Sequence, residues 1–285
     1  MSGLIGVIGG SGLYEIEGIQ GLRFEKIDTP FGCPSDEYAI GTFSGKDVAF
    51  LPRHGRGHVI LPGEINFRAN IYGFKKLGVE WIISLSAVGS LKEELKPMDM
   101  VIVDQFLDRT KGRINTFFGD GIAAHVGFAD PICKELASVL YEAAKEADVT
   151  VHRGGTYVNI EGPAFSTRAE SNVYRKLGMD VLGMTNVVEA KLAREAEICY
   201  ATVAMVTDYD CWHEGHDSVS VDMVLAALLS NAENAKKIIK NSLPKISKER
   251  KCSCKDALST ALITARDKMP DVTKKKLDII IGKYI

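Results

Sequence analysis

Short apolar runs that alternate with helical patterns constrain the fold of this chain more than any other feature. The runs are a few residues long and often β-branched, as is typical of strands buried on both faces of a sheet. Between them, apolar residues recur at three- and four-residue steps, the spacing of one helix face. The predicted strands are Leu4–Ile8, Asp47–Leu51, Trp81–Leu85, Met100–Val103, Thr156–Ile160, Asp180–Gly183 and Cys199–Val206. The predicted helices are Pro62–Leu77, Asp130–Ala147, Thr167–Leu177, Val187–Glu195 and Ser220–Asn241.

This alternation predicts an α/β layer architecture, with helices covering a parallel or mixed sheet. Asp130 followed by Pro131 is a typical helix start, an N-cap before a proline at the first helical position. Ser220 is a second N-cap candidate. The sequence contains no internal repeat and no low-complexity linker. We therefore expect residues 1–285 to form a single domain, with a C-terminal helical tail from about residue 246.

The charge balance excludes some partners. Lys plus Arg number 35 and Asp plus Glu number 37, so the formal net charge is −2. Nucleic-acid binding draws on a surplus of cations, so we expect no nucleic-acid partner, although a local cationic pocket for one small anion remains allowed. No apolar run reaches the roughly 20 residues of a membrane span. Met1–Tyr14 lacks the Lys or Arg that begins a secretory signal. The expectation is a cytoplasmic protein with no membrane partner.

The first strand ends in Gly9-Gly10-Ser11-Gly12. Glycines after a strand expose backbone N–H groups as an anion-binding nest. The dinucleotide-binding fingerprint fails, because Glu15 stands where its third glycine would be. The sequence also lacks the Gly-Lys-Ser or Gly-Lys-Thr of a Walker A loop. Two interpretations remain: a small phosphate loop that uses the Ser11 hydroxyl, or a plain tight turn.

The second strand ends in Arg53-His54-Gly55-Arg56-Gly57-His58. The planar fork of an arginine matches phosphate oxygens, and glycine lets the main chain come close. Open α/β sheets bind ligands at strand ends, so this block favours phosphate binding over a solvated turn. A metal site on His54 and His58 is the weaker alternative, because no carboxylate or cysteine accompanies them at ligand spacing.

Three further blocks follow predicted strands. Ser84–Ser90 offers hydroxyl and N–H donors, or an N-cap at Ser90. Glu161–Arg168 combines an acid with Phe165, which would stack on a flat ring or belong to the core. Thr207-Asp208-Tyr209-Asp210 has two acids one residue apart, which form either an acid–base pair or an Asx turn. Together the blocks suit displacement of an aromatic leaving group by phosphate.

The chain has six cysteines, and Cys252-Ser253-Cys254 is the only closely spaced pair. C-x-C is not the C-x-x-C of zinc ribbons or thioredoxins, and a zinc site would need further ligands that the sequence does not identify. We therefore expect no metal. Reduced thiols are the default for a cytoplasmic chain, and a Cys252–Cys254 or longer-range disulfide remains open.

The strand-end blocks together resemble those of a known family. They are Ile8-Gly9-Gly10-Ser11-Gly12-Leu13, Asp28-Thr29-Pro30-Phe31-Gly32, Arg53-His54-Gly55, Ala87-Val88-Gly89-Ser90-Leu91, Asp104-Gln105-Phe106, Glu161-Gly162-Pro163, Ser166-Thr167-Arg168-Ala169-Glu170-Ser171 and Thr207-Asp208-Tyr209-Asp210. From about residue 3 to about residue 245 the chain resembles the trimeric purine nucleoside phosphorylase family, within it the enzymes that act on 5'-methylthioadenosine. The Cys252-Ser253-Cys254 tail resembles the disulfide-bearing ends of some archaeal members.

The resemblance implies a three-layer fold, a mixed sheet flanked by helices, in a trimer or a dimer of trimers. It implies phosphorolysis of methylthioadenosine to adenine and 5-methylthioribose 1-phosphate, with no metal and no organic cofactor. By position, the phosphate site comprises Ser11, Arg53, His54, Ser86, Ala87 and Thr185. The catalytic acids are Asp208 and Asp210, and the ribose and base site adds Phe165, Met184 and Thr207. The methylthio pocket comprises Val221, Leu225 and His125, with His125 reaching in from a neighbouring subunit.

The acid pair indicates which purine is bound. A carboxylate accepts a hydrogen bond from the 6-amino group of adenine, and a carboxylic acid donates one to N7. Hypoxanthine and guanine carry an acceptor at position 6, so Asp208 and Asp210 favour a 6-aminopurine. The alternative is a broader purine nucleoside phosphorylase that accepts adenosine or inosine. The chain departs from the family pattern at Ala164, where many members have Arg, and at Val188, where many have Pro.

Overall fold

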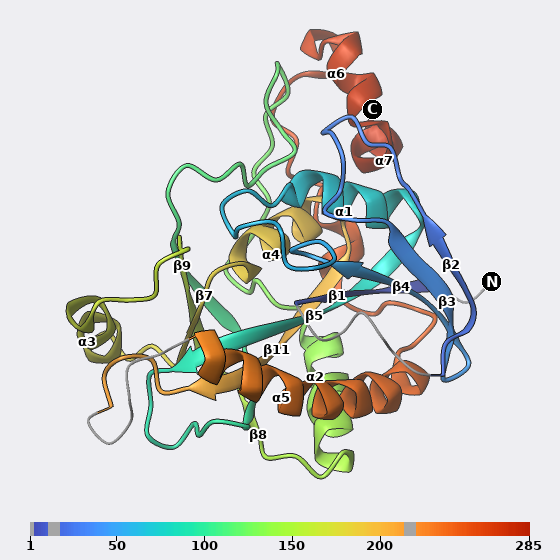
Figure 1. The fold of residues 1–285 in the computed structure, drawn as a ribbon. Helices are drawn as coiled ribbons and strands as arrows, with labels where there is room; N and C mark the ends of the chain where they lie inside the picture. The colour runs from blue at the N-terminus through green and yellow to red at the C-terminus, as the bar shows by residue number, and fades with distance from the viewer. Residues whose placement is uncertain (1–2, 11–17, 214–220) are drawn as a thin grey trace.

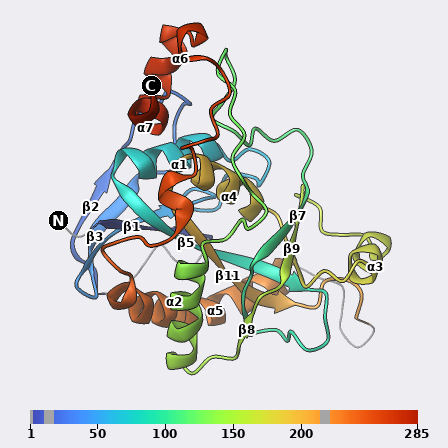
Figure 2. The same ribbon diagram turned by 180° about the vertical axis from the view of Figure 1, so that it is seen from behind.

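The computed structural model describes residues 3–10, 18–213 and 221–285, except the side chains of residues 221–226 and 228. A mixed sheet forms its centre, and helices cover both faces (Figures 1 and 2). The strands are β1 (Leu4–Gly9), β2 (Gln20–Glu25), β3 (Tyr38–Phe43), β4 (Lys46–Pro52), β5 (Val79–Ser90), β6 (Met100–Ile102), β7 (Gln105–Arg109), β8 (Val151–Arg153), β9 (Thr156–Ile160), β10 (Val181–Gly183) and β11 (Cys199–Asp208). The helices are α1 (Phe67–Lys76), α2 (Lys134–Glu146), α3 (Arg168–Lys176), α4 (Asn186–Glu195), α5 (Val221–Ser242), α6 (Asp271–Lys276) and α7 (Asp278–Ile281).

The long strand β5 is the branch point of the sheet, whose main path runs β2-β3-β4-β1-β5-β10-β9-β7. Residues 79–84 of β5 pair in parallel with β1, whereas Gly89 and Ser90 pair antiparallel with β10. On its other edge β5 pairs in parallel with β11, which continues to β6 and β8. Neither β1 nor β10 pairs with residues 85–88 of β5. The sheet therefore opens on that edge, beyond the carboxyl end of β1.

Two helical layers cover the sheet, as the resemblance predicts. In Figure 1, α1 and α4 lie above the sheet, and α2 and α5 pack against each other below it. The core between the layers is apolar, and β11 is buried along its whole length. This is the expected three-layer α/β arrangement. Helix α3 lies at the edge, after β9 (Figure 2).

Two predicted helix starts are wrong. Asp130 and Pro131 do not begin α2; its N-cap is Cys133, and the helix begins at Lys134. The Cys133 N–H donates to the Tyr200 carbonyl at 2.9 Å. This hydrogen bond holds the end of the preceding loop against β11. Helix α1 begins at Phe67 rather than Pro62, because the Asn66 side chain caps it by accepting from the Ala69 N–H. The Ser220 cap lies outside the described residues.

The sequence prediction missed four strands, β2, β3, β7 and β8. Strand β2 is exposed along most of its length and lacks an apolar run, so its residue pattern resembles a loop. Strand β7 begins inside a polar stretch and joins the sheet only through β9. Edge strands of this kind are stabilised by pairing rather than by burial, which residue patterns do not reveal.

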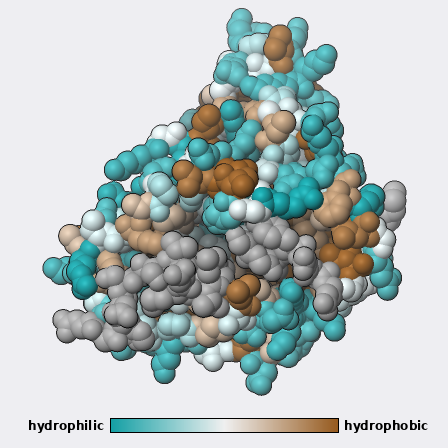
Figure 3. Space-filling model, viewed as in Figure 1, coloured by the Kyte–Doolittle hydropathy of each residue, from teal (hydrophilic) through white to brown (hydrophobic). Residues whose placement is uncertain are grey.

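Residues 246–285 form short helical turns that pack onto the same core. Ile246, Leu258, Leu277 and Ile281 are buried in the main hydrophobic cluster. Within the described residues, no helix combines the length and the hydropathy needed to cross a membrane. The face drawn in Figure 3 is largely hydrophilic, and its hydrophobic residues form separate patches. The tail thus belongs to the packed body of the chain.

Candidate active site

A cavity of about 570 Å³ lies where β5 leaves β1 for β10. This volume is within the range of small-molecule sites, and strand ends of α/β sheets are their usual location. The cavity joins polar groups at one end to an apolar wall. Its lining residues are Gly10, Arg53, His54, His58, Leu61, Pro62, Ser86, Ala87, Val88, Gly89, Pro163, Phe165, Leu182, Gly183, Met184, Thr185, Met205, Thr207, Asp208 and Asp210.

Asp208 and Asp210 stand at the end of β11, and both are buried. Asp208 Oδ1 accepts from the Asp210 N–H at 2.8 Å, and Oδ2 accepts from the Thr207 hydroxyl at 2.6 Å. A register shift between Val206 and Asp208 places Asp208 beside Gly89 of β5. Each carboxylate oxygen of Asp208 therefore has a fixed donor, and the side chain is held in one orientation.

Both acids hold a proton more strongly than an exposed carboxyl group does. Burial raises the pKa of Asp208, although the hydrogen bonds from Thr207 and the Asp210 N–H act to lower it. Burial, together with the charge of Asp208, raises the pKa of Asp210 to about 6. Two close carboxyls titrate as a pair, and the first proton to bind is shared between them. The pair can therefore carry a proton close to neutral pH.

Gly89 makes this arrangement possible. A Cβ at Gly89 would lie 3.0 Å from Asp208 Oδ1 and 3.3 Å from the Asp210 Cβ. Both contacts are tighter than ordinary van der Waals distances, so any side chain here would push the acids apart. Gly89 lines the cavity as well. Sequence reasoning placed Gly89 in a donor block but did not identify its contact with the acids.

Arg53 is buried, and its fork faces a carboxylate that sequence reasoning did not assign. Nε and Nη2 donate to Glu189 at 2.7 and 3.0 Å. Nη1 donates to the Leu85 carbonyl at 2.6 Å, and Nη2 also donates to Ser84 Oγ at 2.7 Å. Among contacts with the described residues, these four bonds leave one of the five guanidinium N–H groups, on Nη1, for a ligand. Glu189 occupies the fork of Arg53, so a phosphate in the cavity would meet the remaining Nη1 hydrogen, and phosphate binding by Arg53 stays a prediction.

Glu189 is the centre of a buried polar network. Besides Arg53 it accepts from Ser84 Oγ at 2.9 Å and from the Tyr200 hydroxyl at 2.8 Å. Its side chain is 1% exposed, so the charge of Arg53 is matched inside the protein. Buried charges of this kind require a paired and hydrogen-bonded partner. The only sequence signal for Glu189 was an acid in the first turn of a predicted helix.

His54 is neutral at pH 7. Burial and the neighbouring charge of Arg53 lower the pKa of His54 to about 4. Its Nδ1 bonds the Ile60 carbonyl at 2.8 Å, so in the neutral ring Nδ1 carries the hydrogen and Nε2 is an acceptor. His58 stacks on it, with ring centroids 4.2 Å apart. His54 can thus accept a hydrogen bond from a protonated phosphate oxygen.

The other predicted phosphate-site residues that the structure describes also line the cavity. Ser86 and Ala87 come from the unpaired edge of β5, and Thr185 is the N-cap of α4. The Thr185 side chain makes no capping bond, and the positive end of a helix favours an anion. The preceding Gly10 also lines the cavity, whereas Ser11 lies outside the described residues.

Phe165 and Met184 belong to the apolar wall, together with Val88 and Met205. Phe165 is 43% exposed, so it covers the cavity rather than the core. Glu161, from the same sequence block, is not among the lining residues. It accepts from Arg113 Nε at 3.0 Å and thereby joins the loop after β7 to the end of β9.

Three predicted substrate residues are not placed in this cavity. His125 is exposed and does not line it. Helix α5 begins at Val221, but the side chains of Val221 and Leu225 lie outside the described residues. The ten other predicted site residues apart from Ser11 all line one cavity, namely Arg53, His54, Ser86, Ala87, Phe165, Met184, Thr185, Thr207, Asp208 and Asp210.

Comparison with known proteins gives consistent matches. The phosphorylase superfamily model matches residues 4–244. The S-methyl-5'-thioadenosine phosphorylase of Koribacter versatilis is 61% identical over 100% of this chain and 97% of its own. A methylthioadenosine phosphorylase from an antarctic soil metagenomic library has a TM-score of 0.92 at 51% identity, covering 97% of this chain and 98% of its own. A mutant adenosine/methylthioadenosine phosphorylase from Schistosoma mansoni, solved with adenine, has a TM-score of 0.83 at 36% identity, covering 94% and 99%.

Proposed function

The chain belongs to the phosphorylase superfamily, and we propose that it catalyses the phosphorolysis of S-methyl-5'-thioadenosine to adenine and 5-methylthioribose 1-phosphate. One observation carries the proposal: a single cavity joins a buried acid pair to a set of anion donors and an apolar wall. The names of relatives that match almost the whole chain support the same reaction.

The acid pair serves the leaving base. Cleavage of the glycosidic bond builds negative charge on adenine and positive charge on the sugar. A proton held by Asp208, or shared between Asp208 and N7, neutralises the departing base. The second carboxyl accepts from the 6-amino group. Because the pair is buried, its interactions with the base are stronger than they would be in water.

The opposite end of the cavity serves phosphate. The remaining Nη1 hydrogen of Arg53 and the positive end of α4 face the anion, and the hydroxyls of Ser86 and Thr185 would turn to it from the Ala87 carbonyl and Asn186 Oδ1, to which they donate in this structure. His54 accepts from the phosphate hydroxyl. The bound phosphate then faces the cationic sugar and attacks it. Charged and polar groups that the protein positions in advance to stabilise the transition state usually make the largest contribution to the rate.

A second candidate function is a broader activity that includes adenosine. A matching structure is named an adenosine/methylthioadenosine phosphorylase, and both substrates carry the 6-aminopurine that the acid pair fits. They differ only at the 5' position. Inosine carries an acceptor at position 6 and is expected to be the poorest of the three substrates.

The test is to incubate the full chain with methylthioadenosine, adenosine or inosine, each with and without phosphate. We expect adenine release from methylthioadenosine only when phosphate is present. Equal release without phosphate indicates a hydrolase and contradicts the proposal. Rates for adenosine similar to those for methylthioadenosine favour the broader candidate.

The proposal requires inorganic phosphate as a co-substrate and no metal or organic cofactor in the cavity. It further places His125 in the site of a neighbouring copy, because His125 is exposed and away from the cavity of its own chain. A trimer or a dimer of trimers is the assembly that this arrangement needs. The cytoplasmic location expected from the sequence stays a prediction.

A further inference from the structure

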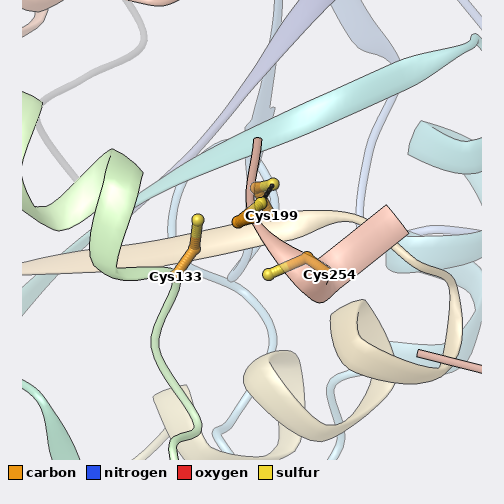
Figure 4. Close-up of side chains that lie close together, drawn as sticks. Cys133, Cys199 and Cys254 are labelled. Atoms are coloured by element: carbon orange, nitrogen blue, oxygen red, sulfur yellow. Dashed lines mark hydrogen bonds between the residues drawn. The ribbon is translucent and has the colours of Figure 1, made fainter. Parts of the chain in front are cut away.

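Four cysteines converge on one point, far from the cavity. The Sγ atoms of Cys133, Cys199, Cys252 and Cys254 all lie within 4.8 Å of one another. Figure 4 shows Cys133, Cys199 and Cys254 meeting from a helix start, a strand and the C-terminal tail. The sequence revealed only the Cys252–Cys254 pair, since the other two ligands are distant along the chain.

The fold holds these four side chains in place by main-chain contacts. Cys133 caps α2, and its N–H donates to the carbonyl of Tyr200, the residue after Cys199 in β11. In the tail, the N–H groups of Lys251 and Cys252 both donate to Glu135 of α2 at 3.2 Å.

A second anchor lies just before the cysteine pair. Arg250 donates to the Glu197 carbonyl at 2.6 Å and to the Glu80 carboxylate at 2.9 Å. The tail is thereby fastened to α2, which Cys133 caps, to Glu197 just before β11, and to β5. The four thiols are therefore brought together by the body of the fold and not by the short Cys-x-Cys turn alone.

The four sulfurs lie close enough together to serve one closed, four-coordinate site. Zinc takes four thiolates at about 2.3 Å, which sets sulfur–sulfur separations of about 3.8 Å. The Cys199 and Cys252 sulfurs are 3.2 Å apart, and no pair exceeds 4.8 Å. Three of the four cysteines are buried, as is typical of structural rather than catalytic zinc sites. We propose that Cys133, Cys199, Cys252 and Cys254 bind one Zn²⁺ ion that fastens the tail to the α2–β11 face.

Zinc binding at this site can be written with protons and charges in balance. Four thiols bind Zn²⁺ and release four protons, leaving a centre with a net charge of −2. Two positive groups offset that charge. Cys133 is at the positive end of α2, and the charge of Arg194 acts on Cys254. A soft, thiolate-only set favours zinc over the hard cations magnesium and calcium.

Disulfides are the competing use of the same thiols. A disulfide joins two sulfurs at about 2.05 Å, whereas the Cys199 and Cys252 sulfurs are 3.2 Å apart. No disulfide bond joins any of the six cysteines in this structure. Cys199 begins β11 and Asp208 ends it, so nine strand steps, about 30 Å, separate the cluster from the acid pair. The metal is therefore structural and takes no part in the proposed reaction.

The first experiment measures metal, thiols and mass on the full chain, expressed with zinc and purified under reductant without chelator. We expect about one zinc per chain and the mass of the fully reduced protein. Disulfides, seen as the loss of two hydrogens each with no zinc, overturn the proposal. So do six free thiols without metal, or iron in place of zinc.

The second experiment uses variants. Cys133→Ser and Cys254→Ser are each expected to lower the zinc content at least tenfold. The exposed Cys33→Ser, outside the cluster, is the matched control and keeps its zinc. Zinc retained in both cluster variants contradicts the assignment.

A third measurement avoids variants that fail to fold. The wild-type chain is titrated with a mercurial thiol reagent while a zinc indicator dye reports release. We expect release of about one zinc as the four thiols of the cluster react. Reloading the stripped chain with Co²⁺ should give the visible absorption of a tetrahedral thiolate centre. Reloading with Zn²⁺ should raise Tm by about 5 °C or more. Absence of both effects excludes the site.

Discussion

Asp208 offers two carboxylate oxygens to two separate donors, the Thr207 hydroxyl and the Asp210 N–H. An asparagine has one oxygen, so its amide N–H would face one of these donors, and it holds no proton for N7. We expect Asp208→Asn to lower kcat/KM for methylthioadenosine at least tenfold. The exposed Asp267→Asn is the control for the same chemical change. Unchanged kinetics in Asp208→Asn would remove Asp208 from the mechanism.

A substitution at Gly89 tests the same pair of acids by displacing them. An alanine at Gly89 places a Cβ 3.0 Å from Asp208 Oδ1, and the acids must move. We expect Gly89→Ala to lower kcat/KM by about 10- to 100-fold, since small displacements of catalytic groups are costly. Gly127→Ala is the matched control, because a Cβ there meets nothing within 4 Å. Equal activity of the two variants would show that the acids tolerate the displacement.

The raised pKa of Glu195 predicts that the free energy of unfolding depends on pH. Burial raises the pKa of Glu195 to about 7 from an ordinary value of 4.5. Between these values the folded chain binds more protons than the unfolded chain, so the stability contribution of Glu195 falls as pH rises through that window and is constant above it. Glu195→Gln cannot titrate. The difference in unfolding free energy between wild type and Glu195→Gln should fall by about 3 kcal/mol from pH 4.5 to pH 8.

Urea unfolding of both chains across this pH range measures the Glu195 effect. Subtracting the variant from the wild type cancels the other titrating groups, which the two chains share. A difference that does not vary with pH would mean that Glu195 is ionised throughout, held so by its bonds from Thr116 and the Phe117 N–H.

The first turn of helix α4 carries Glu189, the partner of Arg53. We therefore expect the stability of the fold to depend on Glu189. Glu189→Gln leaves the buried guanidinium without a counter-charge and turns an amide N–H toward its donors. Breaking a buried pair of this kind costs about 3–5 kcal/mol. We expect a clear fall in Tm, measured by thermal melting, whereas the exposed Glu249→Gln changes it little. A Tm equal to that of wild type would mean that Arg53 finds other acceptors.

Sequence patterns predicted most of the strands that are buried on both faces, although the largely buried β3 was missed. The runs in β1, β4, β5 and β11 were identified because both faces of these strands are covered. The exposed β2 was missed, because its stability comes from pairing with β3. The sequence pattern also placed the end of β5 at Leu85. The small and polar residues that follow interrupt the apolar run, although they continue the strand.

The candidate site was predictable in its members but not in its pairings. Strand ends meet at one edge of a sheet, so residues such as Arg53 and Asp208 could be grouped from their positions. Glu189 is separated from Arg53 by 136 positions in the sequence, so its place in the fork of Arg53 depends on how the fold positions α4. The convergence of Cys133 and Cys199 with the tail is likewise a product of packing, which spacing along the chain does not encode.

At the scale of the whole molecule, the tail does more than cover the core. Its segment around Leu262 forms a bridge with Ala124, and the Ala261 carbonyl accepts from the His125 N–H at 2.9 Å. The Ala123 N–H donates to Thr264 Oγ1 at 2.8 Å. The tail that we propose to be fastened by zinc therefore also fixes the position of the exposed His125.

A histidine that serves a neighbouring copy predicts complementation between two defective chains. His125→Ala and Asp208→Asn are each expected to lower kcat/KM for methylthioadenosine at least tenfold when expressed alone. Suppose that equal amounts of both variants assemble into rings at random. A site is intact when its own chain is His125→Ala, which keeps Asp208, and its neighbour is Asp208→Asn, which keeps His125. This combination occurs in about a quarter of sites. Co-expressed and purified together, the two variants should recover about a quarter of wild-type kcat/KM. Activity no higher than the mean of the two separate variants would place His125 outside every shared site.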